Sequence, residues 1–436
     1  MSGSSRSLDR FATTFDHEGL VANAGLILAG TLMARLGLLG LIERWVRTGS
    51  ANPGPKICTV VAAMLAGGTH IDHVEMLRAG RTGRVLGFAP MAPSTVGSFL
   101  RTFTFGHVRQ LEAVASRTLA RAWALGAGPG KAPLVVDLDS TVCEVHGKQK
   151  QGAAYGYTSV LGYHPLLAAR ADTREVLGAR MRKGSAGSSR GVVRFVDKLV
   201  ANLRRAGATG PTTVRADSGF WSWKLIDRLD AHDIKWSITV ALRSSVRTAI
   251  QAISDDAWAD IDYTKDGHAQ VAETTYATGR GKAKRTVRLV VRRTRLAQGA
   301  QRRLWPDWRH HAFITNTEHD TAAADEFHRG HAVVELAIRD LKEGSGLEHV
   351  PSGHYGANCA PLACAALAHN IGHWTDTLAG APAATNRSRR TRLVALAAVA
   401  VNRSGTPTLR YPARWPWAPQ FTATLSALRA LPGPSG

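Results

Sequence analysis

The sequence contains few cysteines, and their positions exclude two common uses of cysteine. No two of them form a Cys-x-x-Cys pair, which argues against a zinc knuckle and against a disulfide framework. We therefore expect ordinary reduced thiols. The residues concerned are Cys58, Cys143, Cys359 and Cys364.

Long hydrophobic runs are also missing. The most apolar stretch covers residues 24–34 and is too short to span a bilayer. No apolar core follows the basic residues near the N-terminus, so no secretory signal is visible. These absences favour a cytoplasmic protein without a membrane partner.

Acidic residues are scarce relative to basic ones. The chain has 55 lysines and arginines against 33 aspartates and glutamates, which gives a net charge of +22. A folded chain this basic usually binds a polyanion, and nucleic acid is the leading candidate. The hydrophobic fraction of 44% is ordinary for a folded protein, and 436 residues suggest two or three structural units.

Residues 1–130 have helical periodicity and no acid cluster. Apolar residues recur on nearly every turn over 20–46, as in a packed helical pair with a break near Gly37. Another helix is expected to start at Pro93 with Ser94 as its N-cap. Short helices joined by glycine-rich turns fit a helix-turn-helix module, and they fit plain helical packing equally well.

From Pro133 onward, strands and helices alternate, which is typical of an α/β core. Between about 244 and 310 this alternation gives way to antiparallel strands with turns at 266–267 and 279–282. Ten basic residues and no acid lie between Arg280 and Arg303. Charges of one sign on adjacent strands repel each other unless an anion neutralises them.

Two aspartates follow the apolar start of the strand at 134–143. Asp137 and Asp139 are two residues apart and therefore point to the same side of an extended strand. Buried carboxylates repel each other, so they usually require a cation, a proton transfer or a strong donor. The alternative is a strand that simply leaves the core with acids at its exit.

Two more acids lie on other elements of the expected α/β core. Asp217 ends the strand expected at 213–216, and Glu335 lies on a helix expected over 321–341. On that helix, other polar residues form one stripe with Glu335, although an ordinary surface ion pair between Glu335 and Arg339 would also explain part of it. The other members of the stripe are His328, His331, Arg339 and Lys342.

A sheet and a packed helix can bring Asp139, Asp217 and Glu335 to one edge. Three converging carboxylates make an all-oxygen site suited to Mg²⁺. Two such ions would activate a water or a 3′-hydroxyl and stabilise the leaving oxygen in phosphoryl transfer on nucleic acid.

Taken together, these residues resemble the DDE transposases of bacterial insertion sequences. The resemblance covers about residues 10–425 and rests on an ordered set of motifs separated by a β-stranded insertion. Asp139-Ser140-Thr141 looks like the family's Asp-x-Thr, and Asp217-Ser218-Gly219-Phe220 looks like its Asp-x-Gly-Phe. Glu335 and Lys342 match the second half of its Tyr-x2-Arg-x3-Glu-x6-Lys helix.

This resemblance implies an α/β fold with a ribonuclease H-like core, interrupted by an antiparallel β insertion and preceded by an all-α domain. It implies a bacterial enzyme that binds the terminal inverted repeats of its element, cuts their 3′ ends and joins them to target DNA, usually as a dimer. Asp139, Asp217 and Glu335 would hold two Mg²⁺ ions, for which Mn²⁺ can substitute. The implied divisions are a helical DNA-binding domain (1–130), the first core part (131–243), the basic insertion (244–310), the second core part with the Glu335 helix (311–380) and a C-terminal segment (381–436).

The resemblance also implies which residues contact DNA. Lys342 would bind a phosphate, and the arginine-rich insertion would contact the backbone. At the family's tyrosine and arginine positions this chain has His328 and His331, with Arg329 as a nearby substitute. Neutral histidine binds phosphate less well than arginine. The residues expected at the DNA are Lys342, Arg339, Arg329, His328, His331, Arg288, Arg292 and Arg293.

Two alternative functions remain open. A catalytically weakened, transposase-derived DNA-binding protein would keep the basic surface, and the two histidines favour it mildly. Asp137-x-Asp139-x-Thr141 also looks like the nucleophile motif of haloacid dehalogenase-type phosphatases, in which the first aspartate is phosphorylated. Two features argue against such a phosphatase. Its motif normally lies near the N-terminus of the fold, and Asp217 is not followed by the second acid that these enzymes use to bind Mg²⁺.

Histidine pairs at 310–311 and at His369 and His373 could suggest another metal site. Paired histidines on apolar helices are more often structural, and we expect that role here.

Overall fold

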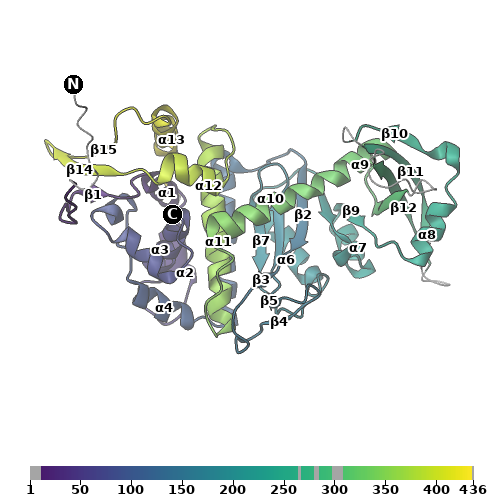
Figure 1. Ribbon diagram of the computed structural model, residues 1–436, viewed down its shortest axis with the longest axis horizontal. Helices are drawn as coiled ribbons and strands as arrows, with labels where there is room; N and C mark the ends of the chain where they lie inside the picture. Colours follow the sequence, from purple (N-terminus) through teal and green to yellow (C-terminus); the bar gives the residue numbers. More distant parts are fainter. Residues whose placement is uncertain (1–10, 264–266, 279–283, 297–307, 435–436) are drawn as a thin grey trace, which may run out of the picture.

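The computed structural model describes residues 11–263, 267–278, 284–296 and 308–434 of the chain. Its central feature is a nine-stranded sheet with the strand order β10-β11-β12-β13-β9-β8-β2-β6-β7 (Figure 1). The strands are β2 (Leu134–Ser140), β6 (Leu166–Arg170), β7 (Val176–Arg180), β8 (Thr212–Ala216), β9 (Lys235–Thr239), β10 (Ala259–Ile261), β11 (Gly267–Thr278), β12 (Arg285–Leu296) and β13 (Arg309–Thr315).

Five of these strands form the core that carries the acids. β2, β6 and β7 pair antiparallel in chain order, whereas β8 pairs parallel with β2 and β9 pairs parallel with β8. The resulting order β7-β6-β2-β8-β9 places β2 in the middle, and its core side is apolar because Val136 and Leu138 are buried. This is the mixed α/β arrangement that the sequence predicted for the core.

The insertion extends the same sheet. β11 and β12 form a long antiparallel hairpin, and β13 joins that hairpin to the core by pairing antiparallel with β9. The turn expected at 266–267 falls partly, and that at 279–282 wholly, outside the described residues, as do Arg280, Lys282, Arg302 and Arg303 of the basic run. A small second sheet, β3-β5-β4, lies beside the core. Its strands are β3 (Cys143–Glu144), β4 (Ala154–Tyr155) and β5 (Leu161–Tyr163).

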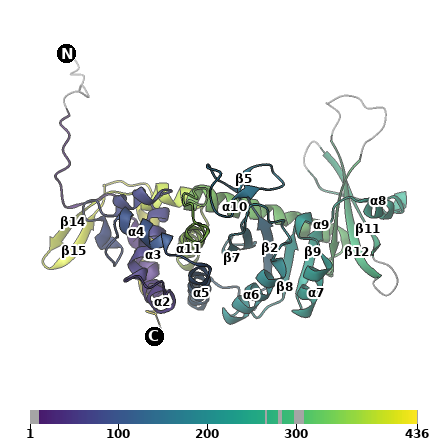
Figure 2. The ribbon, with the colours of Figure 1, turned by 90° about the horizontal axis from the view of Figure 1, so that it is seen from below.

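Helices cover both faces of the core strands. Figure 2 shows α6 (Val192–Arg205) and α7 (Trp223–Ala231) on one face, and α9 (Thr321–Arg329) and α10 (Val333–Arg339) on the other. The helix expected as one piece over 321–341 is therefore subdivided. A 3₁₀ turn at Gly330–Ala332 separates α9 from α10, and a π-helical turn, Asp340–Gly344, follows α10. α8 (Ser244–Gln251) packs against β11 of the insertion.

The N-terminal part is helical, as the sequence predicted. Gly37 has a φ of 58° and separates the first two helices, in line with the expected break. Ser94 is not an N-cap: the fourth helix starts at Pro93, Ala92 is the residue before it, and proline at the first helical position needs no donor partner. The helices are α1 (Leu26–Arg35), α2 (Leu38–Trp45), α3 (Pro53–Leu65), α4 (Pro93–Arg101) and α5 (Phe105–Ala122), with short 3₁₀ helices at Ile71–Leu77 and Thr82–Val85.

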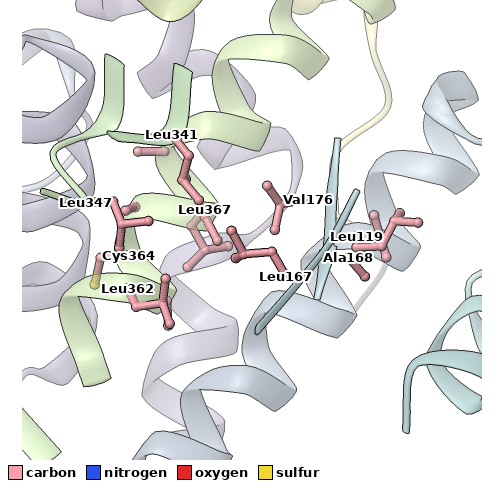
Figure 3. Close-up of a cluster of buried hydrophobic side chains, with 14 of the residues drawn as sticks. Leu119, Leu167, Ala168, Val176, Leu341, Leu347, Leu362, Cys364 and Leu367 are labelled. Carbon is pink, nitrogen blue, oxygen red and sulfur yellow. The ribbon is translucent and has the colours of Figure 1, made fainter. Parts of the chain in front are cut away.

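Helix α11 (Tyr355–Leu378) joins the helical part to the sheet. It packs against α3, α5 and β7, and lies between α3 and β7 in Figure 1. Figure 3 shows Leu362 and Leu367 of α11 in one buried cluster with Leu341, Leu347 and Val176. This cluster fixes α11 against both the sheet and the segment that follows α10. All four cysteines are buried and free, as expected.

The two ends of the described chain meet in a three-stranded sheet. β1 (Leu20–Val21) pairs with β14 (Ala398–Arg403), which pairs with β15 (Thr406–Arg410). Two further helices, α12 (Asn386–Arg389) and α13 (Ala418–Ala430), complete the C-terminal segment. Among the described residues no single helix is long and apolar enough to cross a membrane, although α1 and α2, bent by 57°, pass that test as a pair by length and composition alone.

Candidate active site

Asp139 and Asp217 come from the carboxyl ends of neighbouring parallel strands. The last paired residues of β2 and β8 are Leu138 and Ala216, so the two aspartates are the next residues on adjacent strands. Each is oriented by a local backbone donor. Oδ1 of Asp139 accepts the N–H of Ser140 at 2.6 Å, and Oδ1 of Asp217 accepts the N–H of Gly219 at 3.0 Å.

Glu335 approaches from the helix that covers this face. α10 packs Val334 and Ala337 against Ala169 of β6, and Glu335 is exposed beside this contact. A recess of about 280 Å³ separates α10 from the end of β2. Its walls are formed by Asp139, Ser140, Thr141, Glu335, Ile338, Arg339, Lys342, Glu343 and Glu348.

The electrostatics of Asp139 show how this recess is charged. Burial is the largest effect and raises the pKa of Asp139 to about 6. The Ser140 N–H and His331 oppose that rise in pKa, whereas the negative charges of Asp217 and Glu335 add to it. Asp139 therefore lies within the field of both other acids.

None of the three acids is paired with a lysine or arginine in the part of the chain that the structure describes. In particular, the ion pair between Glu335 and Arg339 that was the ordinary alternative does not form. The candidate ligand atoms are carboxylate oxygens, and Arg339 and Lys342, which line the recess, form no ion pair with these acids among the described residues. These residues fit a hard divalent ion such as Mg²⁺.

Asp137 has a different environment from Asp139. Its side chain is fully buried, and both oxygens are held by Arg215, with Nε–Oδ1 at 2.7 Å and Nη2–Oδ2 at 2.9 Å. Nδ1 of His331 lies 3.0 Å from the same Oδ1. The sequence analysis favoured Asp139 over Asp137 as the metal ligand, and in the structure Asp137 is compensated within the core. Arg215 is a residue that the sequence analysis missed, although an arginine inside a buried strand is itself a signal of a buried acid.

The two histidines expected at DNA both face the protein interior in this structure. His331 turns toward Asp137 and its side chain is 14% exposed. His328 is buried, lies 2.8 Å from Ser237 Oγ and 2.9 Å from Thr239 Oγ1, and stacks on Phe313. Burial lowers the pKa of His328 to about 2, so its ring is neutral.

Three predicted DNA-contacting arginines are also engaged inside the protein. Arg292 pairs with the fully buried Asp325 at 2.9 Å, and Arg329 holds the other oxygen of Asp325 at 2.9 Å. Arg293 lies between the rings of Trp258 and Trp308, at 4.2 and 4.6 Å from their centroids. Arg292 and Arg293 are 12% and 15% exposed, so little of either side chain is open to a partner in this structure.

The remaining predicted contacts differ in their availability. Arg288 pairs with Glu273 and donates to the carbonyl of His319 at 2.7 Å, which occupies most of its donors. Lys342 lines the recess and donates to the carbonyl of Val142 at 3.0 Å. Arg339 is exposed beside Glu335 and is the basic group best placed to meet a phosphate. Glu343 and Glu348 are further recess acids that the sequence analysis did not single out.

Comparison with known proteins adds the family. A solved cryo-EM structure of a piggyBac transposase synaptic complex with hairpin DNA is similar to this chain, with 11% identity, a TM-score of 0.47, and coverage of 86% of this chain and 79% of that one. No curated protein matches. The family model described as transposase DDE domain group 1 matches residues 6–433, which is nearly the whole chain. The chain therefore belongs to the DDE transposases of domain group 1, whose DDE domain implies polynucleotidyl transferase activity.

Proposed function

We propose that this transposase binds the terminal inverted repeats of its own insertion element, cuts the DNA at their 3′ ends and joins these ends to target DNA with Mg²⁺. One observation carries the proposal. Asp139 and Asp217 end adjacent parallel strands, Glu335 shares an open recess with Asp139, and no lysine or arginine within the described residues forms an ion pair with the three acids.

The three carboxylates would hold two Mg²⁺ ions, for which Mn²⁺ can substitute. When bound, the ions would act as Lewis acids that activate water or a 3′-hydroxyl and stabilise the leaving oxygen. The protein orients the carboxylates through the N–H groups of Ser140 and Gly219, and keeps Asp137 away from the reaction by pairing it with Arg215. Arg339 and Lys342 line the same recess and would bind phosphates beside the scissile bond.

DNA would also be bound outside the recess. We assign recognition of the ends to the helical domain 1–130, and a supporting role to the β-stranded insertion 244–310. Because the elements of the insertion extend the core sheet, they lengthen the surface on the side of β9. Two ends must be held together for transposition, so we expect a dimer in the complex with DNA.

The rival functions receive less support from the side-chain contacts. A phosphatase would need Asp137 as an accessible nucleophile, yet this carboxylate is fully buried and paired with Arg215. A non-catalytic DNA-binding protein was suggested by His328 and His331. The hydrogen bonds of both histidines within the protein account for their presence without a loss of catalytic activity.

Strand cleavage of a duplex that carries the element's own end tests the proposal. The natural chain is compared with Asp217→Asn in Mg²⁺, and DNA binding is measured in parallel. Asp227→Asn is the matched control, because Asp227 is an exposed acid on α7, outside the recess, and pairs with Arg285 of β12. We expect cleavage by the natural chain and the control, none by Asp217→Asn, and equal binding by all three.

The opposite results are equally informative. Binding by the natural chain without cleavage in either Mg²⁺ or Mn²⁺ would contradict the proposal and favour a DNA-binding relic. Cleavage by Asp217→Asn at the natural rate would remove Asp217 from the site. Asp139→Asn and Glu335→Gln extend the same comparison to the other two acids.

A further inference from the structure

A second group of potential metal ligands lies behind the Glu335 helix. His369 and His373 are one turn apart on α11, and Asp340 begins the π-helical turn that follows α10. One ligand atom from each of the three side chains lies within 4.8 Å of the others, and all three residues are buried. Asp340 Oδ2 is 3.1 Å from His373 Nε2 and 3.5 Å from His369 Nδ1.

The hydrogen bonds of His369 fix the direction of its lone pair. Nε2 lies 2.8 Å from the carbonyl oxygen of Arg174, and a carbonyl only accepts, so Nε2 carries the hydrogen. In the neutral ring, Nδ1 then presents a lone pair toward the carboxylate of Asp340. This Nδ1 is buried and has no hydrogen-bond partner among the described residues. Two acceptors that face each other at 3.5 Å require a proton or a metal ion between them.

The basic residues nearby do not supply this positive charge. Arg389 forms its ion pair with Asp376, and Arg390 donates to the carbonyl of Gly344 at 2.5 Å. Within the described residues, Asp340 has no lysine or arginine partner, and its other donors are the backbone N–H of Asn386 at 2.9 Å and the ring of His373. The direct hydrogen-bond donors to this carboxylate are therefore a backbone amide and an imidazole.

Two of the three separations between the ligand atoms, 3.1 and 3.5 Å, are close to those around a tetrahedral ion. At a metal–ligand distance of about 2.0–2.1 Å, neighbouring ligand atoms of a tetrahedron are roughly 3.3 Å apart. Two of the three ligands also have an orienting contact of the kind that metal sites use. The carbonyl of Arg174 accepts from His369, and the N–H of Asn386 donates to Asp340. Two imidazoles and one carboxylate suit Zn²⁺ and disfavour Mg²⁺ or Ca²⁺.

We propose that Asp340, His369 and His373 bind one Zn²⁺ ion, at a site separate from the three catalytic acids. Asp340 lies between Glu335 and Lys342 in the chain, so this ion fastens the end of the Glu335 helix to α11. Figure 3 shows the adjacent Leu341 close to Leu367 of α11, which already brings these two segments together. The ion is structural, and its presence does not depend on the proposed DNA reaction.

Metal analysis of the full-length protein tests the site. The protein is purified without a metal-affinity step and dialysed, and its zinc content is measured by mass spectrometry. We expect about one Zn²⁺ per chain, and less than a tenth of that in His369→Gln and His373→Gln that remain folded by circular dichroism. His70→Ala is the matched control, because His70 and His349 form a more exposed histidine pair with ring centroids 3.7 Å apart.

A second measurement keeps the test decisive if the variants fail to fold. The natural chain is refolded with Co²⁺ and, separately, with Zn²⁺ or with EDTA. We expect the absorption bands of tetrahedral Co²⁺ and a higher Tm with Zn²⁺ than with EDTA, since an ion that binds only the native state stabilises it. A natural chain that is folded, zinc-free and unchanged in Tm by Zn²⁺ would overturn the proposal, as would zinc that disappears in His70→Ala.

Discussion

Arg215 on β8 pairs with Asp137 at the directly opposite position of β2, and both guanidinium contacts are 2.9 Å or shorter. Two residues further along β2, Asp139 has no basic partner among the described residues. Asp137 and Asp139, two residues apart on one strand, thus have different roles. The first joins β2 to β8 and to His331 of the Glu335 helix, whereas the second is left available to a cation.

This difference predicts opposite effects of two similar substitutions on stability. Asp137→Asn leaves Arg215 buried without a counter-charge, so we expect the free energy of unfolding to fall by about 3–5 kcal/mol. Asp139→Asn removes a carboxylate that is repelled by its neighbours, so the metal-free protein should be as stable as the natural one or more stable. Urea denaturation of both variants measures this. Equal losses in both would contradict the assignment.

The raised pKa of Asp139 predicts a pH dependence of stability. Its pKa is about 6 in the folded protein and 3.8 ordinarily, so the native state binds the proton more tightly. The stabilisation by the protonated group is complete below about pH 4 and is lost as the pH rises through about 6, a change of roughly 3 kcal/mol.

Metal-free urea denaturation at several pH values isolates this contribution. The stability difference between the natural chain and Asp139→Asn should shift in favour of the variant as the pH rises from about 4 to about 7. Mg²⁺ should reduce that shift, since a bound cation compensates the ionised carboxylate. A difference that is independent of pH would show that Asp139 is not perturbed.

The arginines should separate into a DNA-binding group and a structural group. Arg339 is exposed at the recess, so Arg339→Ala should weaken DNA binding and reduce the slope of log K against log salt by about 1. Arg292 is bound to the buried Asp325, so Arg292→Ala should leave that slope unchanged and lower the free energy of unfolding by about 2–4 kcal/mol. Binding titrations at several salt concentrations distinguish the two, and the reverse pattern would restore Arg292 to the DNA surface.

Replacing His328 with the family's tyrosine should not help DNA binding. The ring of His328 is bonded to Ser237 and Thr239 and stacked on Phe313 at 4.1 Å, so a larger ring must displace these neighbours and leaves one hydroxyl unpaired. We expect His328→Tyr to cost about 1–3 kcal/mol of stability with unchanged DNA affinity. A gain in affinity would show that residue 328 reaches the DNA.

Strand periodicity and motif order were enough to predict the α/β core and the separate acids. Asp139 and Asp217 could be assigned to strand ends because residues at the exits of apolar strands are visible in a linear pattern. The interruption before Glu335 was equally visible, since alternating strands and helices gave way to antiparallel strands. Helix α6 (Val192–Arg205) buries Phe195, Leu199 and Leu203 on one face, and this periodicity is likewise visible in the linear sequence.

Side-chain direction was not predictable from the sequence. The prediction that His328, His331 and Glu335 form one stripe assumed one continuous helix with one exposed face. The 3₁₀ turn at Gly330–Ala332 and the packing on the sheet turn the two histidines toward the protein interior. Glu335 stays exposed at the recess that it shares with Asp139. In the same way, a run of arginines predicted positive charge but not its partners, because Asp325 lies far along the chain from Arg292.

The sequence by itself therefore determined the class of fold, the net charge and the identity of the chemical groups. These properties depend on local periodicity and on composition, which a chain carries along its length. Only the tertiary structure decided which carboxylate is neutralised and which stays available. That choice depends on contacts between distant residues, such as Arg215 with Asp137 and His369 with Asp340, and on the burial that makes each charge costly or cheap.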